Sequence, residues 1–449
     1  MRHGLATVSH SRRLHLAVHL LAAAVLALAA SAPTALPDLA LMFLGWPRWL
    51  FASAAIVALL GLITCRPPLA RPSMVACLLL SATLTGLGAL ELLFRALHHD
   101  FDQTEARLKR LPPFFRKPLV PAGTVFYRRA GPEHWTGRPL HALLEEQRVR
   151  PNPYTNEAVI TVAYDALGFR NEPDLADWEI AVAGDSFTEL GHLPFDRLFT
   201  TRLGELLGRR VRNLGVSHTG PLTHLHYLEA FGLAPSTRGV VIMFYEGNDL
   251  ADLAYEAAAL DEFAVTGRRP KRGRCPQTSF LLALHQALTR HHREPQTFAA
   301  MANAWFDGAS GQKPVTISTP PGRADDIPSR AREALDAFLH RYAELTRQHR
   351  VTARLAYLPT KETVLHDLLS VSADAPEGWA SSPRTDLPTY VAGRCADAGI
   401  PFLDLTSALV AETQQRRELL FSGMYDTHLN RRGAEVVARE LAAWWALNR

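Results

Sequence analysis

Apolar and polar positions change their pattern near residue 100 of this chain. Before that point charged residues are sparse, and three apolar runs, Leu14–Ala32, Trp49–Cys65 and Ser73–Leu90, carry no charge. Each run is close to the ~20 residues that a helix needs to cross a bilayer. Three such runs in one block are hard to bury in a small domain. We therefore predict about three transmembrane helices in residues 1–100.

The first apolar run has a second interpretation. Arg12 and Arg13 precede it and an Ala-Ala-Ser-Ala stretch ends it, as in a cleavable signal peptide. Basic residues before the first run, and Arg66 and Arg71 before the third, favour cytoplasmic positions for those segments. Whether or not the first helix is cleaved, the rest of the chain then lies outside the cytoplasm. We expect a bacterial inner-membrane protein with a periplasmic domain.

Beyond residue 175, short apolar runs alternate with stretches of helical spacing. The strand-like runs are 180–183, 211–214, 239–245, 352–358 and 401–405. The helix-like stretches are 197–207, 222–232, 330–350, 383–398 and 432–447. This alternation predicts an α/β fold, a parallel sheet flanked by helices on both faces.

Three parts of the chain differ in character. Residues 1–100 form the membrane region, and 101–175 are a Pro-rich connecting segment that we expect to be irregular and to wrap the domain. Residues 176–449 form the globular domain. Within it, 250–330 interrupt the alternation, so we predict an insertion beside the site.

Net charge and cysteine content bear on the binding partners and on possible metal sites. The net charge of +4 makes no strong case for nucleic acid. Cys275 and Cys395 lie in the outer domain, where an oxidising compartment would allow a disulfide, but the sequence does not give their separation. No zinc-type Cys/His spacing occurs, so we expect no metal and no cofactor.

Four polar motifs follow predicted strands or precede the closing helix. They are Gly184-Asp185-Ser186, Asn213-Leu214-Gly215, Gly247-Asn248-Asp249 and Asp426-Thr427-His428. Sites of parallel sheets lie at the carboxyl ends of the strands, so these motifs are expected to gather there. Taken singly, each also fits an ordinary turn, a helix cap or a packed histidine.

Together the motifs contain the groups that acyl chemistry needs. A serine hydroxyl such as that of Ser186 is a weak nucleophile and requires a base, for which His428 is the best candidate. Asp426 could orient the ring and stabilise its protonated form. The N–H groups of Ser186 and Gly215 and the Asn248 amide are candidate donors to a developing oxyanion.

In order and identity, these motifs resemble the SGNH, or GDSL-type, hydrolase superfamily over roughly residues 160–449. The resemblance implies a flavodoxin-like three-layer fold, with Ser186 as nucleophile and His428 as base. It also implies an oxyanion hole made by the Ser186 N–H, the Gly215 N–H and the Asn248 amide.

The acid motif departs from the superfamily pattern. Asp426 and His428 are spaced Asp-x-His, where many members have Asp-x-x-His. The shorter spacing resembles bacterial relatives that acetylate exported polysaccharides, such as the alginate acetylation proteins. The segment Leu358-Pro359-Thr360-Lys361 is similar to those relatives too.

Three functions fit these residues. The first is a membrane-anchored ester hydrolase that forms an acyl-enzyme on Ser186, with acylated cell-surface carbohydrate as substrate and the bilayer as partner. The second is an O-acyltransferase, in which a sugar hydroxyl replaces water as the acceptor. The third is a non-catalytic polysaccharide-binding component. The sequence does not separate the first two, because exclusion of water decides between them.

Overall fold

The computed structural model describes residues 70–97, 99, 101, 104, 111–116, 120–267, 279–284, 296–297, 301–318, 322–377, 379, 384–423 and 426–447, without the side chains of 70–78 and 296. The chain divides into two compact units. One unit comprises Met1–Glu105 and Pro276–Arg293, and the other comprises Ala106–Cys275 and Glu294–Arg449.

The first unit contains the helix α4 (Ala70–Ala96). Its stretch Leu79–Ala96 is long and apolar enough to cross a membrane, and is the one such stretch in the part of the chain that the structure describes. Near its end, Arg95 Nε donates to Glu91 Oε1 at 2.7 Å. The other two predicted transmembrane runs lie outside the described residues.

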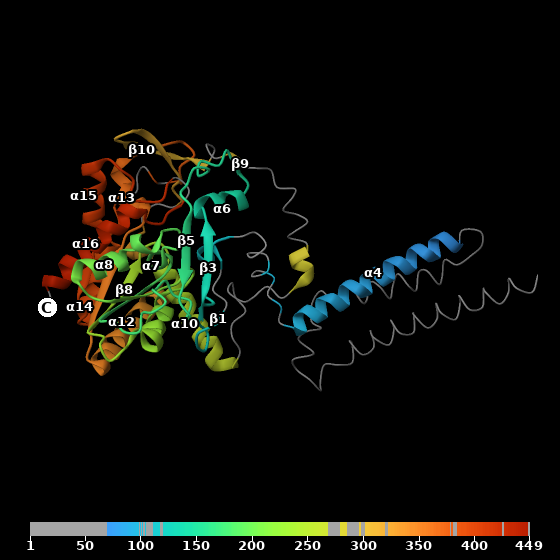
Figure 1. Cartoon of the computed structure of the whole chain (residues 1–449), viewed down its shortest axis with the longest axis horizontal. Helices are drawn as coiled ribbons and strands as arrows, with labels where there is room; N and C mark the ends of the chain where they lie inside the picture. The colour runs from blue at the N-terminus through green and yellow to red at the C-terminus, as the bar shows by residue number, and fades with distance from the viewer. Residues whose placement is uncertain are drawn as a thin grey trace, which may run out of the picture. The chain divides into compact units, whose positions relative to one another are not determined.

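The second unit is built on a five-stranded sheet of order β14-β12-β8-β6-β7 (Figure 1). Its strands are β6 (Ile180–Gly184), β7 (Val211–Gly215), β8 (Gly239–Tyr245), β12 (Thr352–Leu358) and β14 (Phe402–Asp404). Every neighbouring pair runs parallel. These are the five strands that the apolar runs predict, so the α/β fold class is confirmed.

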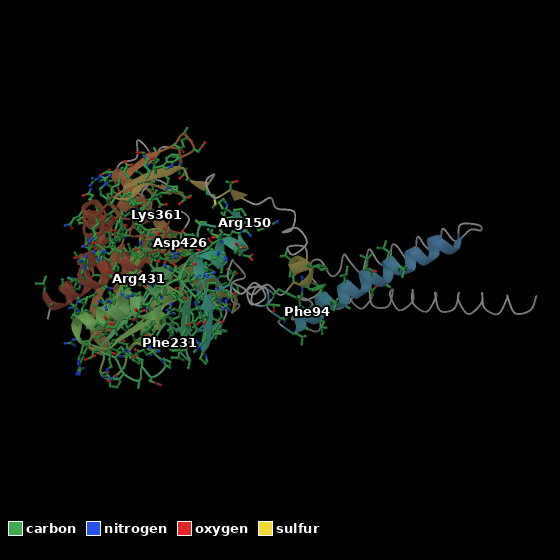
Figure 2. All side chains as sticks on the ribbon, turned by 45° about the horizontal axis from the view of Figure 1, so that its top comes forward. Phe94, Arg150, Phe231, Lys361, Asp426 and Arg431 are labelled. Atoms are coloured by element: carbon green, nitrogen blue, oxygen red, sulfur yellow. The ribbon has the colours of Figure 1, made fainter. Side chains whose placement is uncertain are left out.

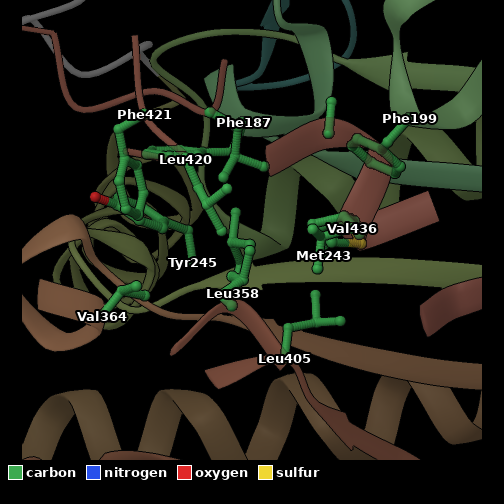
Figure 3. Packing of buried hydrophobic residues seen from close by; sticks show 14 of the residues in the cluster. Phe187, Phe199, Met243, Tyr245, Leu358, Val364, Leu405, Leu420, Phe421 and Val436 are labelled. Carbon is green, nitrogen blue, oxygen red and sulfur yellow. The ribbon is translucent and has the colours of Figure 1, made fainter. Parts of the chain in front are cut away.

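Alternating side chains make two cores, one on each face of this sheet. In β8, Val241 and Met243 belong to one core while Val240 and Ile242 belong to the other, as the period of two in a strand requires. A strand buried on both faces has an unbroken apolar run instead of an alternating one. Figure 3 shows the first core, where Met243 lies among Phe199, Leu358, Leu405 and Val436.

Helices cover both faces. Those that contribute to the first core are α8 (Phe199–Leu207), α13 (Lys361–Leu365), α15 (Thr406–Arg416) and α16 (Arg431–Leu447). Those that contribute to the second are α9 (Pro221–Tyr227), α10 (Asp249–Thr266), α12 (Ser329–His349) and α14 (Leu387–Asp397). The helices and the sheet therefore make three layers, and the carboxyl edge of the sheet stays open to loops.

The helix α12 illustrates how the sequence selects these elements. Leu335, Phe338, Leu339 and Tyr342 are buried and follow helical spacing on one face. Burying each such side chain stabilises the fold by about 1.5–3 kcal/mol. The helix ends where Arg350 takes a left-handed conformation, with φ of 55°.

The connecting segment, which the sequence predicts to be irregular, contains regular structure. Residues 101–175 contain an antiparallel pair, β3 (Glu133–Gly137) with β5 (Ile160–Tyr164), and the helix α6 (Pro139–Glu146). The β3 strand has polar residues on both faces, so it has no apolar pattern to detect. Residues 250–330 begin with α10, which continues directly from Asn248.

A small antiparallel sheet of order β11-β10-β13 adds to this picture. Its strands are β10 (Ala304–Gly308), β11 (Gly311–Val315) and β13 (Leu369–Val371). The first two fall inside the segment predicted as an insertion, and β13 follows β12 much later in the chain. The predicted insertion therefore contributes regular structure of its own.

Candidate active site

The loop after β6 presents Ser186 at the carboxyl edge of the sheet. Asp185 caps the short helix α7 (Ser186–Glu189) by accepting the Phe187 N–H at 2.9 Å. Ser186 is the first residue of this helix, so its own N–H is one of the amides that a helix leaves without an internal partner. Strand, cap and helix start together fix both the hydroxyl and the amide of Ser186.

The Asp426–His428 pair faces Ser186. His428 Nε2 lies 2.8 Å from Ser186 Oγ, and His428 Nδ1 lies 2.5 Å from Asp426 Oδ1. The same carboxylate oxygen accepts the backbone N–H of His428 at 3.2 Å. With Nδ1 protonated toward Asp426, Nε2 accepts the hydroxyl hydrogen of Ser186. The structure thus brings the three predicted residues into one hydrogen-bonded chain.

Charges around this chain favour a basic histidine. Burial alone would lower the pKa of His428, but the charge and hydrogen bond of Asp426 outweigh burial and raise this pKa above its ordinary value. Burial would likewise raise the pKa of Asp426, yet the facing His428 ring lowers it. Asp426 is therefore ionised, and it stabilises the protonated form of its partner.

Ser186 and His428 open onto a cleft of about 460 Å³. The other lining residues are Asp185, Phe187, His218, Tyr245, Asn248, Asp252, Tyr255 and Thr427. Asn248 comes directly before α10, and its amide Nδ2 donates to Asp252 Oδ2 at 2.7 Å. The Asn248 side chain is also hydrogen-bonded to Asp185, so two carboxyl groups orient its amide.

Gly215 does not lie where an oxyanion donor is expected. Its N–H donates to Asn213 Oδ1 at 2.8 Å, and it does not line the cleft. A Cβ on this glycine would lie 2.3 Å from Glu189 N and 2.5 Å from Thr188 C. The residue is a glycine because α7 packs directly against β7. The expectation that the Gly215 N–H serves the oxyanion is therefore corrected.

His218 and Lys361 are two further residues beside the site. His218 is exposed at the cleft in a left-handed conformation with φ of 64°, which turns the chain after β7. Lys361 begins α13 and is buried, with burial lowering its pKa against the opposing charges of Glu362 and Asp426. Figure 2 labels Lys361 and Asp426 in the same part of the domain.

Glu189 anchors the floor of the site. Its buried carboxylate accepts from Arg129 Nε at 2.5 Å, from the Tyr164 hydroxyl at 2.5 Å, and from the Ser217 N–H and Oγ at 2.5 and 2.7 Å. Burial raises the pKa of this carboxyl, but Arg129 and the hydrogen bonds outweigh burial and lower it. The charge is thus paired, and it joins α7 to the loop that carries His218.

Two buried acids lie behind the serine. Asp249 Oδ2 accepts the Tyr245 N–H at 2.8 Å. Burial, with the charge of Asp185 adding to it, raises the pKa of Asp249 well above its ordinary value. Burial also raises the pKa of Asp185 to about 6. Both carboxyls help to fix the strand ends, and neither is hydrogen-bonded to His428 among the described contacts.

Among known proteins, the chain is similar to solved structures. No family model matches the chain, and no curated protein matches it. Among solved structures, 11 chains are similar. One is an acetyl xylan esterase, AlAXEase, at 13% identity and TM-score 0.31, covering 60% of this chain and 98% of its own.

Two further solved structures show the same extent of likeness. A protein described as lipolytic and of the G-D-S-L family, from Desulfitobacterium hafniense DCB-2, has 12% identity and TM-score 0.31, over 59% of this chain and 97% of its own. The α/β hydrolase LAE5, from the metagenome of Lake Arreo, Spain, has 14% identity and TM-score 0.30, over 60% and 94%. At these TM-scores the likeness does not identify a function, and the geometry of the site is the evidence for it.

Proposed function

We propose that this chain is a serine ester hydrolase that acts through an acyl-enzyme on Ser186. One observation carries the proposal: Ser186 Oγ, the His428 ring and Asp426 form a continuous hydrogen-bonded chain of 2.8 and 2.5 Å at the mouth of a cleft. Such a chain is the arrangement by which a neutral histidine activates a serine hydroxyl.

The reaction has two halves. Ser186 Oγ bonds to the ester carbonyl carbon while its proton passes to His428 Nε2, and the proton then leaves with the alcohol as the ester C–O bond breaks. Water next attacks the acyl carbon and gives a proton to Nε2. The bond from that carbon to Ser186 Oγ then breaks, Oγ takes the proton back from Nε2, and the acid leaves. Asp426 stabilises the imidazolium in both halves. The Ser186 N–H and the Asn248 amide are the proposed oxyanion donors, and the His218 backbone, at the cleft, replaces Gly215 as the third candidate.

Acylated cell-surface carbohydrate is the proposed substrate class. The cleft combines aromatic rings, Tyr245 and Tyr255, with polar groups of Asn248 and Asp252. Aromatic faces beside a few placed polar groups suit a ligand with hydroxyls and apolar ring faces. Transfer of the acyl group to a sugar hydroxyl would use the same residues, with that hydroxyl in place of water.

We also propose that the chain is anchored in the bacterial inner membrane with the catalytic domain in the periplasm. The exposed leucines Leu79, Leu80, Leu90 and Leu93 of α4 support the anchor, because lipid would cover them. Extraction at alkaline pH should leave the protein in the membrane fraction, and protease added to spheroplasts should digest the catalytic domain. Release into the soluble fraction, or protection from protease, would refute this arrangement.

The decisive experiment compares wild type with Ser186→Ala on p-nitrophenyl acetate, using purified full-length protein in detergent. Wild type should hydrolyse the ester, and the variant should lose at least ~10³-fold in kcat because it lacks the hydroxyl that is hydrogen-bonded to His428 Nε2. A fluorophosphonate probe should label wild type and not the variant. Turnover that depends on an added sugar would identify a transferase, and equal rates for both proteins would refute the nucleophile.

A further inference from the structure

Ser186 and His428 come from segments 242 positions apart, so some contact must set the distance between them. Asp426 cannot do this, because it lies in the same turn as His428. Packing of α7 and of the turn against the core contributes to this distance. One buried side chain links the two segments directly, and the proposed reaction does not use it.

That side chain is His192, in the loop that follows α7. Its ring is buried, with Nε2 lying 3.0 Å from the Leu429 carbonyl oxygen and 2.9 Å from Ser422 Oγ. A carbonyl oxygen only accepts, so Nε2 carries the hydrogen and donates it. Burial lowers the pKa of His192 to about 4, which keeps the ring neutral and the donor in place at neutral pH.

The two partners of His192 stand at the base of the turn that carries the acid and the base. Phe421 and Leu429 form an antiparallel bridge, and the Ser422 N–H donates to the His428 carbonyl at 2.8 Å. Leu429 directly follows His428. A hydrogen bond to the Leu429 carbonyl therefore holds the backbone next to the catalytic ring.

The loop that carries His192 is itself fixed. The buried Arg170 guanidinium donates to the Leu190 carbonyl at 3.2 Å and to the Leu193 carbonyl at 3.0 Å. The Phe114 ring packs against both histidines, with centroids 5.4 Å from His192 and 4.9 Å from His428. His192 is thus held on the serine side and donates to the base side.

We propose that His192 is a positioning residue that holds His428 at hydrogen-bond distance from Ser186 through the Leu429 carbonyl. The inference rests on the proposed function. His192 does not touch the reacting atoms, and no proton moves through it. It acts by geometry, and a displacement of about 1 Å between reacting groups can lower a rate by roughly 10²-fold.

The test compares His192→Leu, which has no donor, with His192→Gln, whose side-chain amide can reach the same carbonyl. We expect His192→Leu to lower kcat on p-nitrophenyl acetate by about 10- to 100-fold, with KM changed by less than about threefold. His192→Gln should recover most of this loss. The acid limb of the pH profile should not move, because the Asp426–His428 contact lies within one turn.

Tyr342→Phe is the matched control for stability. Tyr342 lies on α12, away from the cleft, and its buried hydroxyl lies 3.0 Å from the Val240 carbonyl oxygen and 2.9 Å from that of Arg354, one of which accepts its hydrogen. Removing this hydroxyl should lower the melting temperature to an extent similar to His192→Leu and leave kcat unchanged. If His192→Leu does not fold, His192→Asn replaces it in the test. The asparagine side chain is one methylene shorter than that of glutamine, so its amide does not reach the Leu429 carbonyl.

A folded His192→Leu or His192→Asn with wild-type kcat would overturn the inference, as would an equal kcat loss in Tyr342→Phe. These outcomes leave the proposed function intact, because wild type remains active. A wild type that neither turns over esters nor reacts with the serine probe would overturn both proposals together.

Discussion

The base side of the cleft and its oxyanion side are held by different kinds of contact. On the base side, Asp426 and His428 belong to one turn, and their side chains meet at 2.5 Å. On the oxyanion side, the proposed donors come from three separate elements: the start of α7, the loop after β7 and the residue before α10. The first arrangement uses two side chains of one turn, and the second combines the Asn248 side chain with backbone amides.

This difference explains why the two sides were not equally predictable. On the base side the reacting groups are side chains that the sequence itself names, so the spacing of a carboxylate and an imidazole along the chain is informative. A backbone N–H is present in every residue except proline, so a motif does not reveal which amide faces a ligand. Gly215 illustrates this difficulty. The lack of a side chain lets Glu189 pack closely against it, and its N–H donates to Asn213 Oδ1.

The largest effect is expected from breaking the base side with Asp426→Asn. Losing the carboxylate removes the group that fixes the tautomer of His428, so kcat should fall by about 10²- to 10⁴-fold. The base works when neutral, so wild-type kcat/KM should fall as pH drops through a value above the ordinary histidine pKa. In the variant burial dominates, and the acid limb should move to lower pH. An unmoved limb would contradict the assigned role of Asp426.

A smaller loss is expected from the oxyanion side in Asn248→Ala. Removing one donor from an oxyanion site lowers kcat by about 10²- to 10³-fold, with little change in KM. Asp252→Asn is the control, since its amide oxygen can still accept from Asn248 Nδ2 and orient it. Equal losses in both variants would mean that the charge of Asp252 matters and that the Asn248 amide does not.

The effect expected from Gly215→Ala is measured on stability. The new methyl would meet Glu189 N at 2.3 Å, so α7 must shift, at a cost of about 1–3 kcal/mol or more in the free energy of unfolding. Thermal melting measures this. Gly393→Ala on α14, where nothing lies within 4 Å of the added Cβ, should melt no lower than wild type. If Gly215→Ala melts like wild type, the packing account of this glycine is refuted.

The sheet was predictable to a similar degree as the base side. Strands such as β8 are buried on both faces, and their unbroken apolar runs stand out from the surrounding sequence. In contrast, β3 is half exposed, and within the described part of the chain its one partner strand is β5, so its residues carry little pattern. The same holds for α15, which has few buried residues, Leu409 among them. Contacts such as that of His192 with Leu429 depend on tertiary packing and have no local signal.

The distance along the chain between Ser186 and His428 has a kinetic consequence. A polypeptide that has just emerged through β6 and β7 already carries the serine, but the histidine arrives 242 positions later. Contacts of such long range form late and fold slowly. On the proposed function, a growing chain therefore carries an inert hydroxyl until the segment with His428 docks, and activity begins only when folding is complete.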